Sequence, residues 1–512
     1  MILFIEPISK NIGMYVPAYP LPLMEIASYV KHNRPETDIE IISIPVDYGL
    51  PLDKAGKEML YRKLLDDIAD LKPEAVGISC TAIAQAGEVV YLCEKIKSLD
   101  PDIVIFVGGY FPTIYHEELL SQTSAIDAVV VGEGELPALR IIDRLKRGAL
   151  PMWAEIPGLV WKNNGRLQKA PVGERFDLKH KALLNLKLLK HPGAYDILPY
   201  AFSRGCPYQC NFCMEDYIRP RRRKVPVDII RRDLTGLLAQ SNTHTLLISD
   251  ALFKSFDLFP FLRQSGLKIN FETRCDVLDP ALIPQIADCC GMLVLGFESA
   301  SYDTLRRMNK VRSRTHYEKY LSNTRAIFKT AARHEIPLMV FMIGGYPGDT
   351  EADLKASLEF AQQLSRHQGP GGHVFKIGEC HVYPKTKIFE LATSLPDVVF
   401  DNDGVFGQNV VRQPSKGLQF DTVLNYNKQI FNLSNPAPKL KETMLKLMPL
   451  FRIPAEALRD AMIPDSCYAG ADRSILDVRG KSLATLRTAI PGLAEKYKND
   501  LSAPRNARLL TI

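Results

Sequence analysis

The sequence is organised around residues 203–213, which read Ser-Arg-Gly-Cys-Pro-Tyr-Gln-Cys-Asn-Phe-Cys. This stretch places three thiols, Cys206, Cys210 and Cys213, close together, and no fourth Cys or His lies nearby in the sequence. Structural zinc sites need four protein ligands, so a zinc knuckle is disfavoured. Iron–sulfur clusters are held by cysteine thiolates. Three thiolates would bind three irons of a [4Fe–4S] cluster and leave the fourth open to a small ligand, which favours catalysis over simple electron transfer.

The spacing Cys-x3-Cys-x2-Cys, with aromatic Phe212 directly before the last cysteine, resembles the signature of the radical S-adenosylmethionine (SAM) superfamily. A predicted short strand, Tyr200–Ser203, leads into it as that family requires. The resemblance implies that SAM binds the open iron and that Phe212 belongs to the cofactor site. It also implies that an electron from the cluster cleaves SAM to give a 5′-deoxyadenosyl radical. A Cys-rich structural loop is the alternative.

Length and composition limit the other possibilities. A chain of 512 residues, 46% hydrophobic and 24% charged, predicts two or three globular domains. It has no apolar run of about 18 residues, so no membrane span is expected. The N-terminus reads as a strand and not as a signal peptide. A net charge of +6 gives little reason to expect nucleic acid binding, and the scattered cysteines do not form a disulfide framework. We expect a cytoplasmic protein.

Residues 1–147 alternate short apolar segments with helix-length ones, which predicts a doubly wound parallel sheet. The expected strands are Met1–Ile5, Ile39–Ile44, Ala75–Ser79, Ile103–Val107 and Ala128–Val131. The expected helices are Leu23–His32, Lys54–Leu71, Ala86–Leu99, Glu117–Ser121 and Leu136–Arg147. Ligands of such sheets bind beyond the carboxyl ends of the strands, where this sequence carries small hydroxyl residues and glycines. Ordinary tight turns are the alternative for each of these loops.

Together these loops resemble the cobalamin-binding domain that precedes many radical SAM enzymes. The resemblance covers about the first 145 residues and assigns eight residues to the cobalamin pocket: Ser79, Thr81, Gly108, Gly109, Thr113, Gly132, Glu133 and Gly134. The Asp-x-His-x-x-Gly motif that supplies a cobalt ligand elsewhere is missing. We expect His32 and His116 to be surface helix residues, so cobalamin would bind without a protein His on cobalt. The absence of the Asp-x-His-x-x-Gly motif also fits a domain that has lost its cobalamin.

Residues 148–198 are expected to be a linker. The segment Ile156–Trp161, followed by an Asn-Gly pair at positions 164 and 165, predicts a small hairpin. The basic, Leu-rich segment Lys179–Lys190 predicts a linker helix.

Residues 199–399 show the alternation again and predict a partial (β/α)6 barrel, the radical SAM core, with its active site at the carboxyl ends of the strands. The expected strands are Tyr200–Ser203, Thr245–Ser249, Ile269–Arg274, Leu293–Phe297, Leu338–Ile343 and Phe375–Val382. The expected helices are Asp228–Gln240, Phe256–Gln264, Ala281–Asp288, Tyr302–Arg307, Tyr317–His334 and Glu351–Ser365. Residues 400–512 predict a helical C-terminal region: Phe420–Phe431, Ala437–Leu447, Pro454–Ala461, Leu476–Leu486 and Gly492–Lys498.

Three charged residues end predicted strands of this core. By resemblance, Asp250 approaches the amino group of SAM, although many relatives have Gly-Gly-Glu here. By the same resemblance, Glu298, in Gly-Phe-Glu-Ser, is expected to contact the ribose or methionyl part of SAM. Arg274 could meet a carboxylate or be solvent-exposed. The turn Gly344–Gly348 is similar to one that lies near the adenine, whereas Lys385 replaces the glycine of a Pro-Gly-Thr turn.

Two further features have plain interpretations. The basic run Arg219–Lys224 is expected to be a solvated loop rather than a nucleic-acid patch. Cys275, Cys289, Cys290 and Cys380 are spaced irregularly and are expected to be small buried residues rather than a second cluster.

The leading hypothesis is a cobalamin-dependent radical SAM methyltransferase. It would methylate an unactivated carbon of a small-molecule or lipid-like substrate, using a 5′-deoxyadenosyl radical and methylcobalamin, with a flavodoxin or ferredoxin as electron donor. The alternative is a radical cyclase or rearrangement enzyme with cobalamin non-methylating or absent. RNA methylthiolation is disfavoured because the additional N-terminal cluster cysteines and a C-terminal β-barrel are not evident. A non-enzymatic corrinoid-binding role would require the three cysteines to be structural.

Overall fold

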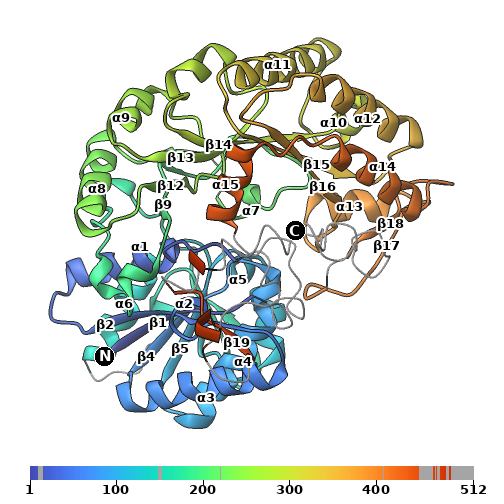
Figure 1. Ribbon diagram of the computed structural model, residues 1–512. Helices are drawn as coiled ribbons and strands as arrows, with labels where there is room; N and C mark the ends of the chain where they lie inside the picture. The colour runs from blue at the N-terminus through green and yellow to red at the C-terminus, as the bar shows by residue number, and fades with distance from the viewer. Residues whose placement is uncertain are drawn as a thin grey trace. The chain divides into compact units, whose positions relative to one another are not determined.

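The computed structural model describes residues 1–9, 15–147, 153–219, 221–407, 409–448, 465–467, 469, 473–479 and 484–485. The chain divides into two compact units (Figure 1). The first comprises Met1–Leu198, Val225–Thr243 and the described part of Leu447–Asn499. The second comprises Pro199–Lys224 and His244–Lys446.

A seven-stranded sheet forms the centre of the first unit, in the order β2-β1-β4-β5-β6-β7-β8. Five strands are parallel, and their apolar runs are buried as expected for a sheet covered on both faces. These strands are β1 (Ile2–Glu6), β2 (Ile39–Ser43), β4 (Ala75–Ser79), β5 (Val104–Gly108) and β6 (Ala128–Val130). The predicted doubly wound sheet is therefore confirmed.

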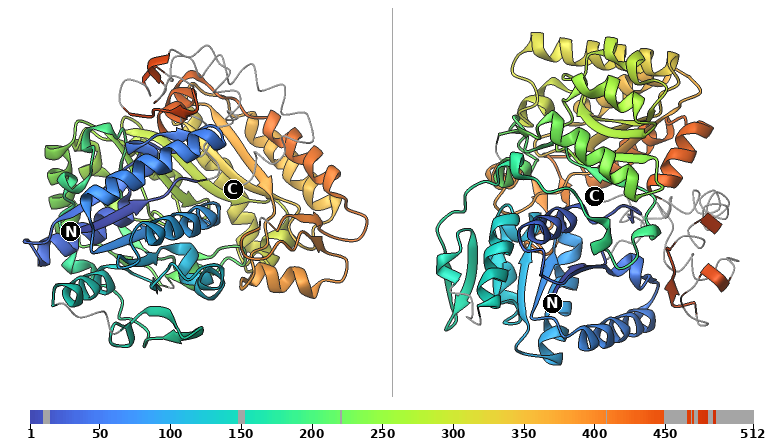
Figure 2. Two further views of the ribbon diagram at one scale, coloured as in Figure 1. Left: turned by 90° about the horizontal axis from the view of Figure 1, so that it is seen from below. Right: turned by 90° about the vertical axis from the view of Figure 1, so that its left-hand side faces the viewer.

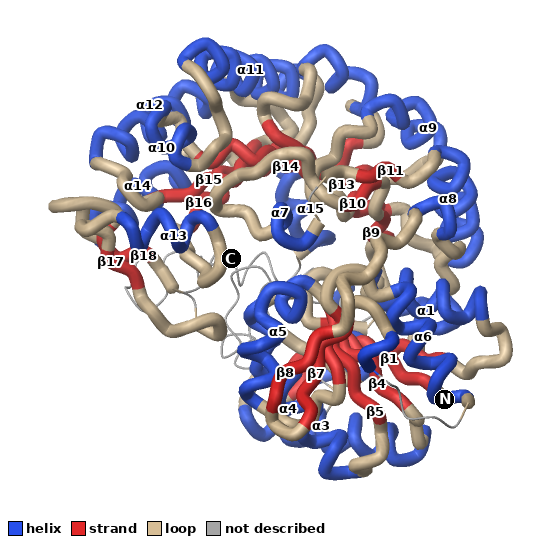
Figure 3. Tube along the Cα trace, turned by 180° about the vertical axis from the view of Figure 1, so that it is seen from behind, coloured by secondary structure: helices blue, strands red, loops and turns tan. Residues whose placement is uncertain are grey.

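The helices of the first unit pack in two groups (Figures 1 and 3). One group contains α1 (Leu21–Asn33) and α6 (Glu135–Lys146), which contact each other. The other contains α3 (Lys54–Leu71), α4 (Ile83–Leu99) and α5 (Tyr110–Gln122). Helix α8 (Val227–Gln240) also belongs to this unit by its contacts.

The predicted hairpin extends this sheet. Strands β7 (Leu159–Asn163) and β8 (Arg166–Lys169) are antiparallel, and β7 pairs with β6. Asn164 and Gly165 join them with φ of 48° and 76°. Two left-handed residues in a two-residue loop match the twist of the strands.

The helix predicted for Lys179–Lys190 is wrong. The segment forms two separate 3-10 turns, Leu178–His180 and Leu186–Leu188. Asp177 and Asn185 accept hydrogen bonds from the backbone N–H two residues later. Such side-chain bonds begin a new turn at each place and compete with a continuous helix.

The second unit is built on a six-stranded open sheet in the order β9-β12-β13-β14-β15-β16 (Figures 1 and 2). The printed pairs from β12 to β16 are parallel, which confirms the partial barrel. The strands are β9 (Leu198–Tyr200), β12 (Thr245–Ile248), β13 (Lys268–Arg274), β14 (Cys290–Glu298), β15 (Leu338–Gly344) and β16 (His373–Glu379). The helices are α9 (Phe259–Gln264), α10 (Tyr302–Arg307), α11 (Arg314–Arg333) and α12 (Glu351–Ser365).

One predicted helix of this unit is a 3-10 helix instead. Pro280–Ile286 replaces the expected Ala281–Asp288, with Pro284 inside it. Proline has no N–H to donate and its ring disturbs the preceding turn, so a regular α-helix does not form there.

Between residues 387 and 448 the chain is mainly helical, apart from a short antiparallel pair formed by β17 (Val399–Phe400) and β18 (Val411–Gln413). It contains α13 (Lys387–Ser394), α14 (Phe420–Asn432) and α15 (Pro438–Leu447), and the last two match predicted helices. The predicted start at Leu476 is wrong, because β19 (Ile475–Leu476) pairs with β3 (Leu50–Pro51). The helices predicted at 454–461 and 492–498 lie outside the described residues. Among the described helices, none is long and apolar enough to cross a membrane.

Candidate functional site

The cysteine loop begins directly after β10 (Ser203–Arg204), which pairs with β11 (Arg223–Lys224). Gly205 permits this turn: its φ is 83°, and a Cβ there would lie 2.4 Å from the Arg221 carbonyl oxygen. A residue with a side chain would be strained and would clash with backbone. The glycine of the quoted stretch is therefore needed to start the loop.

The three cysteines of the loop are free and partly exposed. Burial raises the pKa of the Cys213 thiol to about 12 and raises that of Cys206. In this structure no three or more His, Cys, Asp or Glu side chains among the described residues are arranged to hold a metal ion. The donor set nevertheless suits a cluster, because three unpaired thiols lie on one short loop that solvent can reach.

Arg274, at the end of β13, fixes this loop to the barrel. Its Nη1 donates to Cys210 Sγ at 3.1 Å, and its guanidinium lies 4.0 Å from the centre of the Tyr208 ring. Its other donors bind both carboxylate oxygens of Asp276, at 2.9 and 2.8 Å, and the Lys310 carbonyl at 3.0 Å. Arg274 is 6% exposed, so it is a buried side chain that contacts the loop and not a solvated one.

Asp250 holds the strand that leads into the cysteines. Its Oδ1 accepts from the N–H groups of Phe202 and Ser203, at 2.6 and 2.9 Å. Its Oδ2 accepts from the Ser203 hydroxyl at 2.5 Å. Burial raises its pKa to about 6. Both carboxylate oxygens of Asp250 thus accept hydrogen bonds from the protein itself. The sequence had predicted that this carboxylate approaches the amino group of SAM, which remains a prediction.

Glu298 ends β14 in a left-handed conformation, with φ of 68°. Lys310 Nζ donates to Glu298 Oε1 at 2.7 Å and to the Gly296 carbonyl at 2.7 Å. The same Nζ lies 5.8 Å from the centre of the Phe212 ring. Lys310 therefore brings Glu298 and the aromatic residue of the cysteine motif together. Sequence reasoning missed Lys310, because no local pattern distinguishes it from a surface lysine.

Two turns at the carboxyl edge of the second unit's sheet have the left-handed backbone conformations that their sequences suggested. Gly345 and Gly348 have φ of 75° and 86°, and Tyr346 N donates to Asp349 Oδ2 at 2.9 Å. Lys385 adopts φ of 66°, so it takes the conformation that a glycine would prefer. Lys385 thus replaces the glycine of the Pro-Gly-Thr turn and keeps its left-handed conformation.

The predicted cobalamin-site residues meet at one edge of the first unit. Ser79 and Gly108 are paired at the ends of β4 and β5. Thr113 Oγ1 donates to the Gly109 carbonyl at 2.8 Å and accepts from Gly132 N at 3.0 Å, which ties the loops after β5 and β6 together. A Cβ on Gly132 would meet nothing within 4 Å. This edge combines open space with hydroxyl groups, which suits a large ligand rich in amide groups.

The remaining residues of that edge make contacts within the first unit. Thr81 is exposed and bonds Gln85 Oε1 through its N–H and hydroxyl, and Glu133 accepts from Phe176 N at 2.8 Å. Gly134 precedes α6. His32 is exposed on α1, whereas His116 lies partly buried on α5 with Nδ1 3.4 Å from the Thr113 carbonyl oxygen.

The basic run after the cysteines is partly structural. Arg222 donates to the hydroxyls of Ser203 and Ser255, at 2.9 and 3.0 Å, and Arg223 and Lys224 form β11. Four other cysteines are buried, as predicted: Cys275, Cys289, Cys290 and Cys380.

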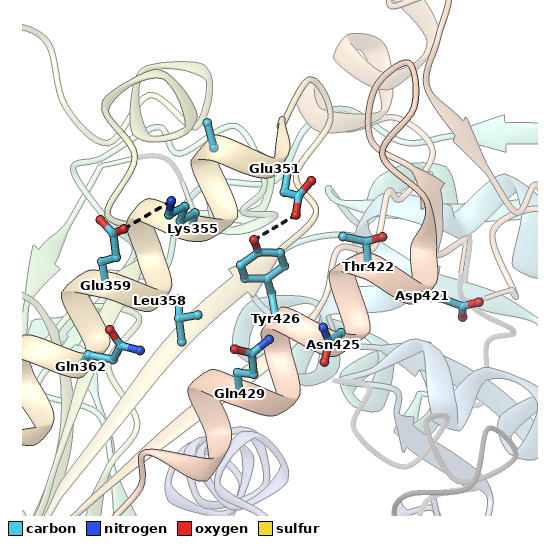
Figure 4. A pocket seen from close by; sticks show the side chains of 11 residues that line it. Glu351, Lys355, Leu358, Glu359, Gln362, Asp421, Thr422, Asn425, Tyr426 and Gln429 are labelled. Atoms are coloured by element: carbon cyan, nitrogen blue, oxygen red, sulfur yellow. Dashed lines mark hydrogen bonds and ion pairs between the residues drawn. The ribbon is translucent and has the colours of Figure 1, made fainter.

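A polar surface hollow lies elsewhere in the second unit, between α12 and α14 (Figure 4). Tyr426 donates to Glu351 there at 3.0 Å, and Lys355 pairs with Glu359 at 4.0 Å. None of the predicted site residues lines it.

Comparison with known families matches both units. Residues 15–142 match the B12 binding domain, and residues 200–361 match the Radical SAM superfamily. The chain is thus a radical SAM enzyme that carries a B12 binding domain ahead of its radical SAM domain. These domains assign it a [4Fe–4S] cluster, SAM and cobalamin as cofactors.

Individual relatives have the same combination or part of it. An uncharacterized methyltransferase of Pyrococcus horikoshii is 25% identical over 73% of this chain and 78% of its own length. The hopanoid C-3 methylase of Methylococcus capsulatus is 30% identical over 43% of each chain. The anaerobic magnesium-protoporphyrin IX monomethyl ester cyclase of Rubrivivax gelatinosus is 25% identical over 51% of this chain and 50% of its own.

A solved structure shares the fold along nearly the whole chain. The radical SAM methyltransferase TsrM of Kitasatospora setae, with cobalamin and a [4Fe–4S] cluster bound, superposes with a TM-score of 0.65. The match covers 98% of this chain and 99% of TsrM at 14% identity.

Proposed function

We propose that this protein is a cobalamin-dependent radical SAM methyltransferase that methylates an unactivated carbon of a small-molecule or lipid-like substrate. The proposal rests on two candidate cofactor sites within one chain, one at the carboxyl edge of each sheet. One edge holds three free thiols on a loop fixed by Arg274, and the other holds linked glycine loops beside Thr113. The methyltransferase and methylase among the relatives support the same reaction.

The cofactors supply the reactive chemistry: the cluster delivers the electron that cleaves SAM, and cobalamin carries the methyl group. The residues of this chain position and shield these groups. Asp250 and Arg274 hold the cysteine loop from its two sides. Lys310 neutralises Glu298 beside Phe212.

We expect a flavodoxin or ferredoxin to donate the electron. Cys206, Cys210 and Cys213 must stay reduced to bind iron, so the protein should act in a reducing compartment such as the cytoplasm.

A radical cyclase or rearrangement enzyme is the second candidate. The relative from Rubrivivax gelatinosus, a cyclase, favours it. In that case cobalamin would not deliver a methyl group.

The products of SAM distinguish the two. The protein would be reconstituted anaerobically with iron, sulfide and hydroxocobalamin, then given a low-potential reductant and methyl-labelled SAM. A methyltransferase should form S-adenosylhomocysteine and transfer label to the bound corrinoid before any substrate is added. Formation of 5′-deoxyadenosine alone, with no labelled corrinoid, would contradict methyl transfer and favour the cyclase.

A further inference from the structure

The guanidinium of Arg274 contacts the sulfur of a predicted cluster ligand. Its Nη1 donates a hydrogen bond to Cys210 Sγ at 3.1 Å. An arginine side chain is not deprotonated in proteins, so this contact places a permanent positive charge beside one thiolate of the predicted cluster. The contact therefore acts on the charge of the sulfur as well as on the position of the loop.

The surroundings of Arg274 keep its guanidinium directed at Cys210. Nε and Nη2 donate to the two carboxylate oxygens of Asp276, at 2.9 and 2.8 Å, and Nη2 also donates to the Lys310 carbonyl at 3.0 Å. The centre of the Tyr208 ring lies 4.0 Å from the guanidinium carbon. The side chains of Arg274 and Asp276 are 8% and 9% exposed, so water screens this charge pair weakly.

The ion pair presents its positive side to the sulfur. Nε and Nη2 form one edge of the planar guanidinium, and Nη1 is the corner opposite that edge. Because Asp276 occupies the edge and Cys210 the corner, the carboxylate and the sulfur lie on different sides of the positive charge. The positive charge is thus nearer to Cys210 than the negative charge of Asp276 is, and the pair favours additional negative charge on the sulfur.

Two other groups that can carry a positive charge lie close to this pair. Lys310 Nζ is paired with Glu298 at 2.7 Å, so its charge is balanced by an acid of its own. His316 Nε2 lies 3.2 Å from Asp276 Oδ2, so it contacts the carboxylate and not the sulfur. Arg274 is therefore the cation that contacts Cys210.

We propose that Arg274 raises the reduction potential of the cluster through its hydrogen bond to Cys210, and that Asp276 limits this rise. Reduction adds one electron to the cluster and breaks no bond, and a low-potential flavodoxin or ferredoxin supplies the electron. Hydrogen bonds to the cluster sulfurs stabilise the more negative, reduced form. The inference rests on the radical SAM assignment and is independent of the proposed methyl transfer.

The test is the midpoint potential of the cluster in the full-length protein reconstituted with iron and sulfide. An anaerobic redox titration followed by electron paramagnetic resonance measures it, without SAM, so the readout does not depend on turnover. Arg274→Gln removes the positive charge beside Cys210. At a fixed potential the ratio of reduced to oxidised cluster should fall about tenfold, a shift of about 59 mV for a one-electron couple.

Asp276→Asn should shift the potential in the opposite direction. It removes the negative charge that opposes Arg274 and keeps the size of the side chain, so the ratio of reduced to oxidised cluster should rise. A purely mechanical role predicts no such opposition, because either substitution would loosen the same loop. Shifts in the same direction, or no shift in either variant, would overturn the proposal.

A second arginine–aspartate pair of the same unit provides the matched control. Arg412 donates through Nε and Nη2 to Asp401, and its guanidinium carbon lies 4.5 Å from the centre of the Phe420 ring. Arg412→Gln and Asp401→Asn therefore change the same charges at a pair that is bonded to itself and not to Cys210. Both variants should keep the wild-type potential, and a shift as large as that of Arg274→Gln would contradict a local effect at Cys210.

SAM affinity separates this role from direct binding of the cofactor. Equilibrium dialysis with labelled SAM should give nearly the wild-type affinity for Arg274→Gln. A lower affinity together with an unchanged potential would overturn the proposal and assign Arg274 to the carboxylate of SAM.

Iron content provides the folding check, and about four irons per chain should remain in each variant. If Arg274→Gln does not hold its cluster, Asp276→Asn decides alone. Its potential should still rise, and an unchanged or lower potential would contradict the proposal.

Discussion

The two parallel sheets of this protein present their carboxyl edges in different ways. The edge of the second unit is held by charged side chains, with Arg274, Asp250 and Lys310 each making two or more bonds. The edge of the first unit is made mainly of backbone, glycines and hydroxyls, as at Gly109, Thr113 and Gly132.

This difference follows from what each edge has to hold. A cluster is bound covalently through three sulfur atoms, so its loop must be placed accurately and side chains provide that accuracy. A large organic cofactor needs area and clearance, which small residues leave open. Substitutions should therefore act through lost bonds in the second unit and through lost space or altered charge in the first.

The largest effect is expected from the cluster ligands. Cys210→Ser should reduce iron from about four per chain to nearly none and abolish SAM cleavage, because a hydroxyl is a poor iron ligand. Iron analysis and 5′-deoxyadenosine formation measure this. Cys289→Ala, which changes a buried cysteine far along the chain, should keep its iron. Normal iron in Cys210→Ser would show that this thiol is not a ligand.

Asp250→Asn tests whether side-chain bonds fix the cysteine loop. The amide cannot accept the N–H groups of Phe202 and Ser203 and also accept the Ser203 hydroxyl, so one buried group loses its partner. We expect the free energy of unfolding to fall by about 2–3 kcal/mol and the iron content to drop. Denaturant unfolding measures the first. The molecules that retain a cluster should bind SAM normally, and a selective loss of SAM affinity would show that Asp250 contacts the cofactor.

The first unit should respond to pH through Glu6. Burial, opposed by the Ser43 hydrogen bond and reinforced by Asp47, raises the pKa of Glu6 to about 7. A carboxyl whose pKa is raised in the folded state costs stability as pH rises from about 4.5 to 7, because the unfolded chain ionises first. Glu6→Gln should thus raise the free energy of unfolding by about 1–2 kcal/mol at pH 8 and change it little at pH 4. Thermal unfolding at both pH values measures this, and an equal shift at both would exclude the titration.

The smallest effect on stability is expected from Gly132→Ala. The added methyl group meets no atom within 4 Å, and only the φ of 92° is unfavourable, so the loss should be about 1 kcal/mol. Corrinoid binding should nevertheless weaken while iron stays unchanged, since the methyl group fills space at the predicted pocket. Spectroscopic titration with hydroxocobalamin measures this. Unchanged corrinoid affinity would remove Gly132 from the pocket.

The sequence was sufficient for most of the fold because its signals are local. Apolar β-branched runs such as Ala75–Ser79, and capped amphipathic segments such as Glu351–Ser365, have the predicted limits. The helix predicted for Lys179–Lys190 does not form, and the cause is also local. Two side-chain hydrogen bonds to the backbone start separate turns there, although the spacing of the leucines suggested one helix.

The site was predictable only in part because its partners come from far along the chain. The cysteine spacing is local and was evident. Asp250 bonds Phe202 across 48 residues, and Arg274 bonds Cys210 across 64.

Cobalamin-dependent methyl transfer requires that one chain bind both cofactors, so the content of both should be measured in one preparation. The protein would be purified anaerobically, reconstituted with iron, sulfide and hydroxocobalamin, desalted, and assayed for corrinoid and iron per chain. We expect about one corrinoid together with about four irons per chain, the content of one [4Fe–4S] cluster. Four irons without corrinoid would contradict cobalamin-dependent methyl transfer and leave a radical SAM enzyme that acts without cobalamin.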